Sequence, residues 1–168
     1  MPDLSYVVYD TAVLTNAVSD QVLFQVPQGG DATHTESFTN ARGAGQFPTG
    51  ESFSIKKISI FPDVKLVVAD EANFILNSFI EIRVSDLTVF KCPLQLCIDR
   101  AAFGGAYTQA AAATEAAIGL IGDGYRLENE IDINGGVSFR VRVYGGTALS
   151  ATGRNVKVAL HGVLTLPG

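Results

Sequence analysis

The sequence predicts an all-β fold, an antiparallel β-sandwich in a single domain spanning residues 1–168. The clearest observation is the alternation of apolar and polar residues within the strands between Tyr125 and Leu166, since a period of two buries one face of a strand and leaves the other wet. A second observation is spacing: about eight or nine short apolar runs follow one another with turn residues between most of them. The length also suits one domain, because no repeat or linker interrupts it.

The amino-terminal part predicts two strands and a loop. Tyr6–Leu14 is β-branched and aromatic, so residues 1–14 are interpreted as an N-terminal arm or an extra edge strand. Gln21–Val26 alternates and then stops at Pro27, which indicates a further strand. Asp31–Pro48 is polar and glycine-rich, and we expect so long a loop to be functional or to be held by a neighbour.

Two apolar runs follow the loop, Phe53–Phe61 and Val64–Ala69, and Pro62 ends the first of them. The first is predicted as a strand because it is rich in β-branched and apolar residues, and the second is a short apolar run. Asp70–Asn73 then indicates a turn or a single helical turn.

A hairpin is expected around Ser85–Asp86. With these two residues as the turn, Val84 lies opposite Leu87 and Ile82 lies opposite Val89. Apolar side chains then stay on one face of both strands, as a half-buried pair requires.

One segment is predicted to be helical, the alanine-rich stretch Ala106–Leu120. Its small side chains suit either a short helix over the open end of the sandwich or a helix packed against a neighbouring subunit. The surrounding Ala101–Gly122 is poor in charge but too weakly apolar to span a bilayer, which takes about 20 strongly apolar residues.

Three strands are expected in the last third of the chain, and the turn Asn134–Gly136 leaves their wiring open. As a hairpin, this turn pairs Glu130 with Arg140 and Glu128 with Arg142 on the wet face. As an arch, it crosses the gap of about 10 Å between two sheets, which three residues can just span. The ion pairs favour the hairpin, whereas the strand count favours the arch.

Composition limits the classes of partner. Charged residues make up 17% of the chain and its mean hydropathy is +0.25, so it is either a compact β-protein or a protomer that hides part of its outside in an assembly. The net charge of −5 provides no basic field for phosphates, so no direct nucleic-acid partner is expected. The amino terminus shows no signal-peptide pattern.

The two cysteines, Cys92 and Cys97, are five positions apart, which is neither a CxxC redox pair nor half of a zinc site. We interpret them as buried, reduced thiols in a strand, although the spacing alone does not decide whether they are free. Free thiols are consistent with assembly in a reducing cytoplasm.

No constellation for catalysis is visible in the sequence. The two histidines, His34 and His161, belong to no His-x-His pair, and no Gly-x-Ser-x-Gly motif occurs, so both are interpreted as polar surface residues. Paired acids occur at Asp70–Glu71 and at Glu128 with Glu130, and the second pair is expected to form surface ion pairs with arginines. We therefore predict no catalytic, cofactor-binding or metal-binding residue, no enzyme activity and no small-molecule substrate.

In the order of its elements the chain resembles the single jelly-roll coat proteins of icosahedral viruses, whose eight strands form two sheets. The shared features are a long early loop, one hairpin within a sheet at Ser85–Asp86, and a late insertion before Tyr125. Among these coat proteins the acidic chain is most similar to the small major capsid proteins of tailless, membrane-containing bacteriophages. The resemblance implies a jelly-roll sandwich with one short Ala-rich helix and these strands: Gln21–Val26, Phe53–Phe61, Val64–Ala69, Ser78–Val84, Leu87–Lys91, Tyr125–Ile133, Val137–Tyr144 and Arg154–Leu166.

The resemblance further implies a structural subunit of a viral capsid, located in the virion and assembled in the host cytoplasm. Its partners would be copies of itself, a second capsid protein and an underlying virion membrane. Strand edges, the Asp31–Pro48 loop and the Ala101–Leu120 segment are then expected to bury surface between subunits. The alternative class is a trimeric receptor- or carbohydrate-binding head, as in a phage fibre or a tumour-necrosis-factor-like domain, which the closing run Val158–Leu166 would also suit.

Overall fold

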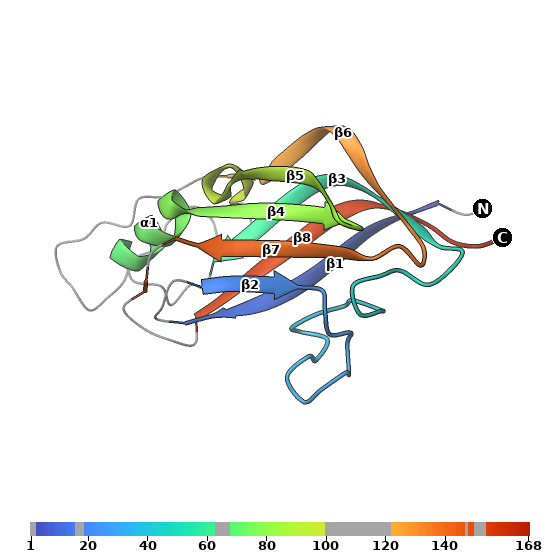
Figure 1. The fold of residues 1–168 in the computed structure, drawn as a ribbon, viewed down its shortest axis with the longest axis horizontal. Coiled ribbons are helices and arrows are strands. Elements are labelled where there is room, and N and C mark those ends of the chain that lie inside the picture. Colours follow the sequence, from blue (N-terminus) through green and yellow to red (C-terminus); the bar gives the residue numbers. More distant parts are fainter. Residues whose placement is uncertain (1–2, 16–18, 63–67, 100–121, 147, 150–153) are drawn as a thin grey trace.

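Two four-stranded antiparallel sheets face each other in the computed structural model, which describes residues 3–15, 19–62, 68–99, 122–146, 148–149 and 154–168 (Figure 1). One sheet has the order β1-β8-β3-β6 and the other the order β2-β7-β4-β5. The strands are β1 (Asp3–Leu14), β2 (Ser19–Leu23), β3 (Ser52–Pro62), β4 (Ser78–Val84), β5 (Leu87–Pro93), β6 (Tyr125–Asn134), β7 (Phe139–Gly145) and β8 (Arg154–Thr165). The helices are α1 (Val68–Asn77) and the 3-10 helix η1 (Leu94–Cys97). The predicted all-β sandwich is confirmed.

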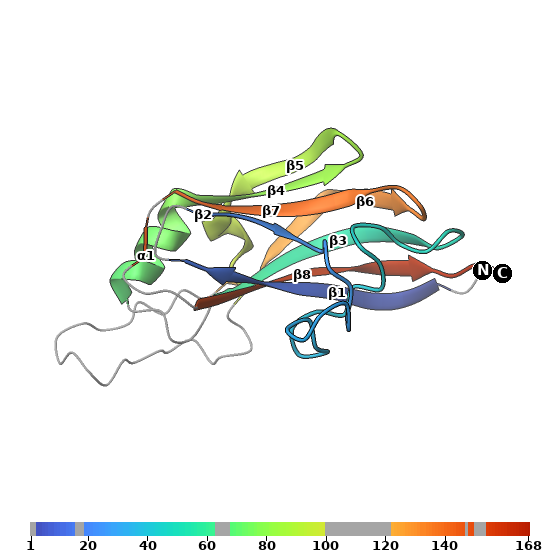
Figure 2. The same cartoon turned by 60° about the horizontal axis from the view of Figure 1, so that its bottom comes forward.

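The strands pair as a nested set, β1 with β8, β2 with β7, β3 with β6 and β4 with β5. β8 also pairs with β3, and β7 with β4, which joins these pairs into the two sheets. Among the strands that the structure describes, only β4 and β5 follow one another in the same sheet, and the others alternate between the two sheets. Figure 2 shows the two layers, with both chain ends at one end of the sandwich and α1 at the opposite end.

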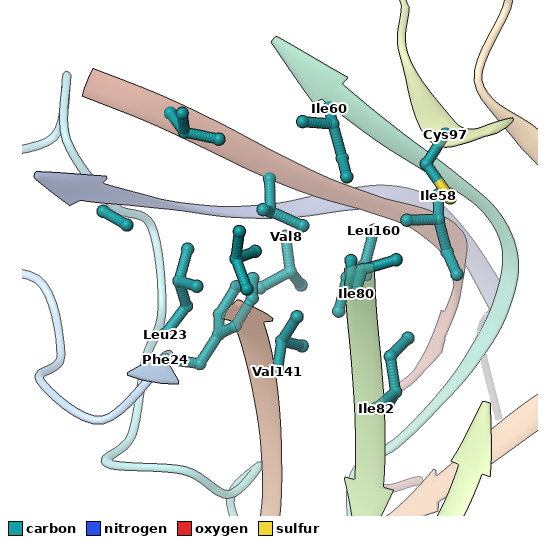
Figure 3. Packing of buried hydrophobic residues seen from close by; sticks show 14 of the residues in the cluster. Val8, Leu23, Phe24, Ile58, Ile60, Ile80, Ile82, Cys97, Val141 and Leu160 are labelled. Carbon is teal, nitrogen blue, oxygen red and sulfur yellow. The ribbon is translucent and has the colours of Figure 1, made fainter. Parts of the chain in front are cut away.

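The core fills the space between the inner faces of both sheets (Figure 3). Ile58 and Leu160 come from one sheet and Ile80 and Val141 from the other, and all four are fully buried. Their alternation with outward residues is what the period of two predicts. Three phenylalanine rings extend the core at the end that holds the chain termini. The Phe47 ring stacks on that of Phe139, with 5.4 Å between centroids, and is tilted against that of Phe53, with 5.2 Å between centroids.

The amino-terminal segment is a full strand of the sandwich. β1 pairs with β8 along its whole length, from Asp3 opposite Thr165 to Leu14 opposite Arg154. Of the two interpretations of residues 1–14, the structure therefore selects the edge strand for the residues it describes. The assignment that made Gln21–Val26 the first of eight strands is therefore wrong, because the first strand of the sandwich lies earlier in the chain.

The described α-helix is α1, which lies where a strand and then either a turn or a single helical turn were expected. Val68 and Ala69 belong to α1, so the strand prediction for Val64–Ala69 is wrong at its end, while residues 63–67 lie outside the described ones. The side chains of Phe74 and Ile75 are 1% and 3% exposed, and this burial at the end of the sandwich stabilises a helix longer than the single turn that the local pattern allowed. The predicted helix Ala106–Leu120 also lies outside the described residues.

The hairpin between β4 and β5 is confirmed at its turn, where Val84 pairs with Leu87. Further along, Ile82 pairs with Phe90 and not with Val89, because a register shift leaves Val89 as an extra residue in β5. The expectation of one apolar face is therefore wrong: the shift turns Phe90 toward the core and leaves Leu87 and Val89 exposed.

The turn Asn134–Gly136 is an arch between the two sheets, since β6 and β7 belong to different ones. Gly135 N donates to the carbonyl oxygen of Glu51 at 2.7 Å and Gly136 N to that of Phe47 at 2.9 Å. The hairpin ion pairs do not form, because Glu130 pairs with Lys56 at 3.0 Å. Arg142 pairs instead with a carboxylate of β2, as described below.

Candidate assembly surface

A sandwich of two open sheets has four edge strands, here β1, β6, β2 and β5. An edge strand presents unpaired N–H and C=O groups that can pair with another chain unless something covers or blocks them. The four edges differ in whether described residues cover them, carry charge along them or leave them open.

The edge of β1 is covered by the chain's own long loop. Asn40 N donates to Tyr9 O at 3.1 Å, its side-chain oxygen accepts from Tyr9 N at 2.7 Å, and its amide nitrogen donates to Val7 O at 2.8 Å. Thr11 Oγ1 donates to Phe38 O at 2.6 Å. Residues 38–40 of the Asp31–Pro48 loop are therefore held by β1 of the same chain (Figure 1).

The end of β2 is tied to β1 by a buried carboxylate. Asp10 is 3% exposed and accepts hydrogen bonds from the backbone N–H groups of Thr11 and Phe24. Burial raises the pKa of Asp10, and these two hydrogen bonds oppose the shift. Phe24 has a φ of 65°, so the chain turns sharply out of the sheet where Asp10 holds it.

Beside this tie, an open hollow of about 440 Å³ lies between β1, β2 and the loop, and His34 and Phe38 line it. His34 Nδ1 lies 2.7 Å from Asp31 Oδ1, and the His34 ring meets the Phe38 ring edge-on. Asp31 also accepts hydrogen bonds from the backbone N–H groups of Thr33 and His34, so the contacts between Asp31 and His34 help to order the loop.

The edge of β6 is blocked by charge. Arg126, Glu130 and Asp132 are exposed along it, and Asp132 Oδ1 accepts a hydrogen bond from Ser54 Oγ at 2.5 Å. Together with the Glu130–Lys56 pair, these side chains discourage the addition of another strand. Glu128 and Glu130 were expected to form surface ion pairs with arginines; the structure instead pairs Glu130 with a lysine.

His161 lies on the outer face of β8, opposite Lys57 of β3. Lys57 Nζ is 3.2 Å from Asp99 Oδ2 and 2.7 Å from Asp123 Oδ1. Burial and the Lys57 ammonium lower the pKa of His161, and its Nε2 has no hydrogen-bond partner in the described part of the chain. Among the described residues no three His, Cys, Asp or Glu side chains are grouped so that they could hold a metal ion.

The other residues singled out in the sequence lie apart from these. Asp70 is buried on α1, so the pair Asp70–Glu71 is not a surface acid pair at its first residue. Cys92 is half-buried in β5, whereas the buried Cys97 ends η1, so only one of the two thiols lies in a strand. Neither cysteine forms a disulfide.

The edge of β5 is open and carries exposed apolar side chains. Leu87 is 72% and Val89 44% exposed, Leu96 on η1 is 50% exposed and Leu76 on α1 66% exposed. β5, η1 and α1 contact one another, and we call the four side chains the β5 edge surface. They are spread along it, from Leu87 at the β4–β5 turn to Leu76 on α1 at the other end of the sandwich (Figure 1). Lys91 is the one charged residue of β5, and its Nζ lies over the Phe79 ring, 4.3 Å from the centroid.

The outer face of the same sheet continues this surface as an ordered polar layer. Arg142 makes two hydrogen bonds of 2.5 Å to Asp20, which lowers the pKa of Asp20 and raises that of Arg142. The Tyr144 ring stacks on Phe79 at 5.0 Å. Because these side chains already satisfy one another, the apolar β5 edge surface beside them gains more from a partner than they do. Exposed apolar side chains also occur on β1 and β2, at Leu4, Val7, Val13 and Val22.

None of the helices described is long and apolar enough to cross a bilayer. No protein-family model matches the chain, and no curated protein matches it.

Proposed function

We propose that this protein is a structural subunit of a viral capsid, a jelly roll that acts by associating with copies of itself. The observation that carries the proposal is the β5 edge surface, an apolar strand edge left open in a chain that covers or blocks two of its other edges.

The strand order supports the jelly-roll type. A jelly roll consists of eight antiparallel strands in two sheets. The nested pairs from β4–β5 out to β1–β8 describe one long antiparallel ribbon folded over on itself, with a single hairpin within a sheet. The order β1-β8-β3-β6 over β2-β7-β4-β5 follows from such folding.

The size of the β5 edge surface favours a shell over an isolated dimer. Removing the exposed parts of four leucine or valine side chains from water stabilises a contact by about 3–7 kcal/mol. Association costs about 4–15 kcal/mol in lost freedom. One such contact is therefore weak, and stable assembly requires several contacts per subunit in closed symmetry.

In this proposal the protein resides in the virion after assembly in the host cytoplasm. Its partners are further copies, a second capsid protein and an underlying membrane. The net charge of −5 argues against direct contact with nucleic acid.

Sedimentation velocity over a range of concentrations tests the proposal, with Val89→Lys as the probe and Val13→Lys as the matched control. The two valines are 44% and 45% exposed and lie on different edges. We expect the wild type to associate as concentration rises, Val89→Lys to need at least tenfold more protein, and Val13→Lys to behave like the wild type.

A wild type that stays a monodisperse monomer at high concentration, and binds no second coat protein, would contradict the proposal. A stable isolated trimer that binds glycans would favour the alternative, a receptor- or carbohydrate-binding head.

A further inference from the structure

The two cysteines meet although they lie on different elements. Cys92 is in β5 and Cys97 ends η1, and their Sγ atoms are 3.3 Å apart. Between them Pro93, with φ −57° and ψ 138°, ends the strand, and the fully buried Leu94 anchors the following helical turn in the core. The short η1 therefore turns the chain so that the second thiol returns to the first.

The environments of the two thiols differ. Cys97 is fully buried among core residues (Figure 3), whereas Cys92 packs against the core from the edge strand and is only partly buried. A hydrogen bond from the Cys97 thiol lowers the pKa of Cys92, and the same contact together with burial raises the pKa of Cys97. Cys92 is thus the thiol that reacts first with a molecule from solvent, and Cys97 is the buried thiol that reacts second, with Cys92.

We propose that Cys92 and Cys97 form a redox-active dithiol site, which closes to an intramolecular disulfide by exchange with a small disulfide such as oxidised glutathione. This inference does not depend on the proposed capsid function.

The exchange proceeds in two displacements. The Cys92 thiolate attacks one sulfur of oxidised glutathione, forms a mixed disulfide and releases one glutathione thiolate, which takes up a proton. Cys97 then gives its proton to solvent and attacks Cys92 Sγ, which releases the second glutathione. Two protein thiols are oxidised to one disulfide, and one glutathione disulfide is reduced to two thiols.

The geometry leaves little movement for the second step. A disulfide bond is about 2.05 Å long, so the two sulfurs must approach by about 1.3 Å. The bond would join the end of β5 to η1, and so fix the open edge strand to an element that is anchored in the core. In a reducing cytoplasm both thiols stay reduced, and in an oxidising environment they form the disulfide.

Titration with glutathione buffers tests the site in the unmodified chain. The native protein and the protein in urea are equilibrated with the same series of reduced-to-oxidised ratios, quenched with acid, alkylated and weighed by mass spectrometry. We expect both thiols to disappear together from a monomer that has lost two hydrogens. We expect the native pair to be half-oxidised in a buffer at least tenfold more reducing than the pair in urea, because the fold holds the sulfurs together.

Two variants separate the roles of the thiols. We expect Cys97→Ser to stop at the mixed disulfide, with one glutathionyl group on Cys92, and Cys92→Ser to resist alkylation while folded. The proposal is overturned if the native wild type accumulates the mixed disulfide, forms its disulfide between molecules, or oxidises no more readily than in urea. The comparison between native protein and urea decides the matter even where a variant fails to fold.

Discussion

Gly135 lies where the arch between β6 and β7 crosses the segment before β3, and alanine would place a methyl group in that crossing. A Cβ at Gly135 would lie 2.2 Å from the carbonyl oxygen of Pro48 and 2.6 Å from that of Glu51. Both are backbone atoms, so one of the two segments must move. Gly136 is the matched control, because a Cβ there meets nothing closer than 3.6 Å although its φ is +77°.

The expected loss for Gly135→Ala combines three effects. Overpacking costs about 1–3 kcal/mol, and a displaced arch loses the hydrogen bond from Gly135 to Glu51, worth about 1 kcal/mol. The lower entropy of unfolded alanine offsets about 0.4–1 kcal/mol of this. We expect a net loss of about 2 kcal/mol for Gly135→Ala and of about 1 kcal/mol for Gly136→Ala, whose cost is the left-handed backbone.

Urea unfolding followed by far-UV circular dichroism measures both losses. With a slope of about 2 kcal/mol per M, the midpoint should fall by about 1 M for Gly135→Ala and by about 0.5 M for Gly136→Ala. A loss for Gly135→Ala that equals or falls below that for Gly136→Ala would refute the close crossing, and with it the arch.

Two further predictions concern the loop and His161. The Asn40 side chain makes two hydrogen bonds to β1, so Asn40→Ala should cost about 1–2 kcal/mol and speed limited proteolysis within the Asp31–Pro48 loop. Ser37→Ala is the control, since the Ser37 hydroxyl contacts Thr35 inside the loop, and equal cleavage of both variants would count against the loop's hold on β1. The pKa of His161 lies below its ordinary value of 6.5 in the folded chain, so the unfolded chain binds the proton first as pH falls. The contribution of neutral His161 to the free energy of unfolding is complete above about pH 6.5 and is lost as the pH falls below that value. Urea midpoints between about pH 7.5 and 5.5 should therefore fall less for His161→Gln than for the wild type. Parallel curves for the two proteins would contradict this.

Patterns that depend on neighbouring residues were predictable from the sequence. β6 begins at Tyr125 as the alternation indicates, and β8 contains the alternating run that starts at Val156, because each strand has one buried and one wet face. The turn at Ser85–Asp86 is also local, and it forms where expected.

Features that depend on distant contacts were not predictable. α1 is stabilised by the burial of Phe74 and Ile75 at the end of the sandwich, which outweighs the strand-like run before it. The arch forms because Gly135 and Gly136 bond to residues 47–51, far away in the chain. Likewise, Val89 is an extra residue in β5 that reverses which side chains of the strand face the core, and alternation alone does not reveal it.

The candidate surface was predictable only as a class. Low charge was compatible with a compact β-protein and with a protomer that hides part of its outside, and which edges are covered depends on contacts such as that of Asn40 with β1. A local signal for β5 did exist, since Leu87–Pro93 carries a single charged residue, Lys91. Without the register of the sheet, the exposure of Leu87 and Val89 could not be inferred from it.

The nested strand pairs also impose an order in which the molecule can form. The β4–β5 hairpin closes the shortest loop, and β3–β6, β2–β7 and β1–β8 each enclose the pair before them, so their closure costs progressively more chain entropy. Folds dominated by such distant pairing form slowly, in milliseconds to seconds. Among the described strands β1 leaves the ribosome first and its partner β8 leaves last, so the sandwich closes only after β8 has emerged.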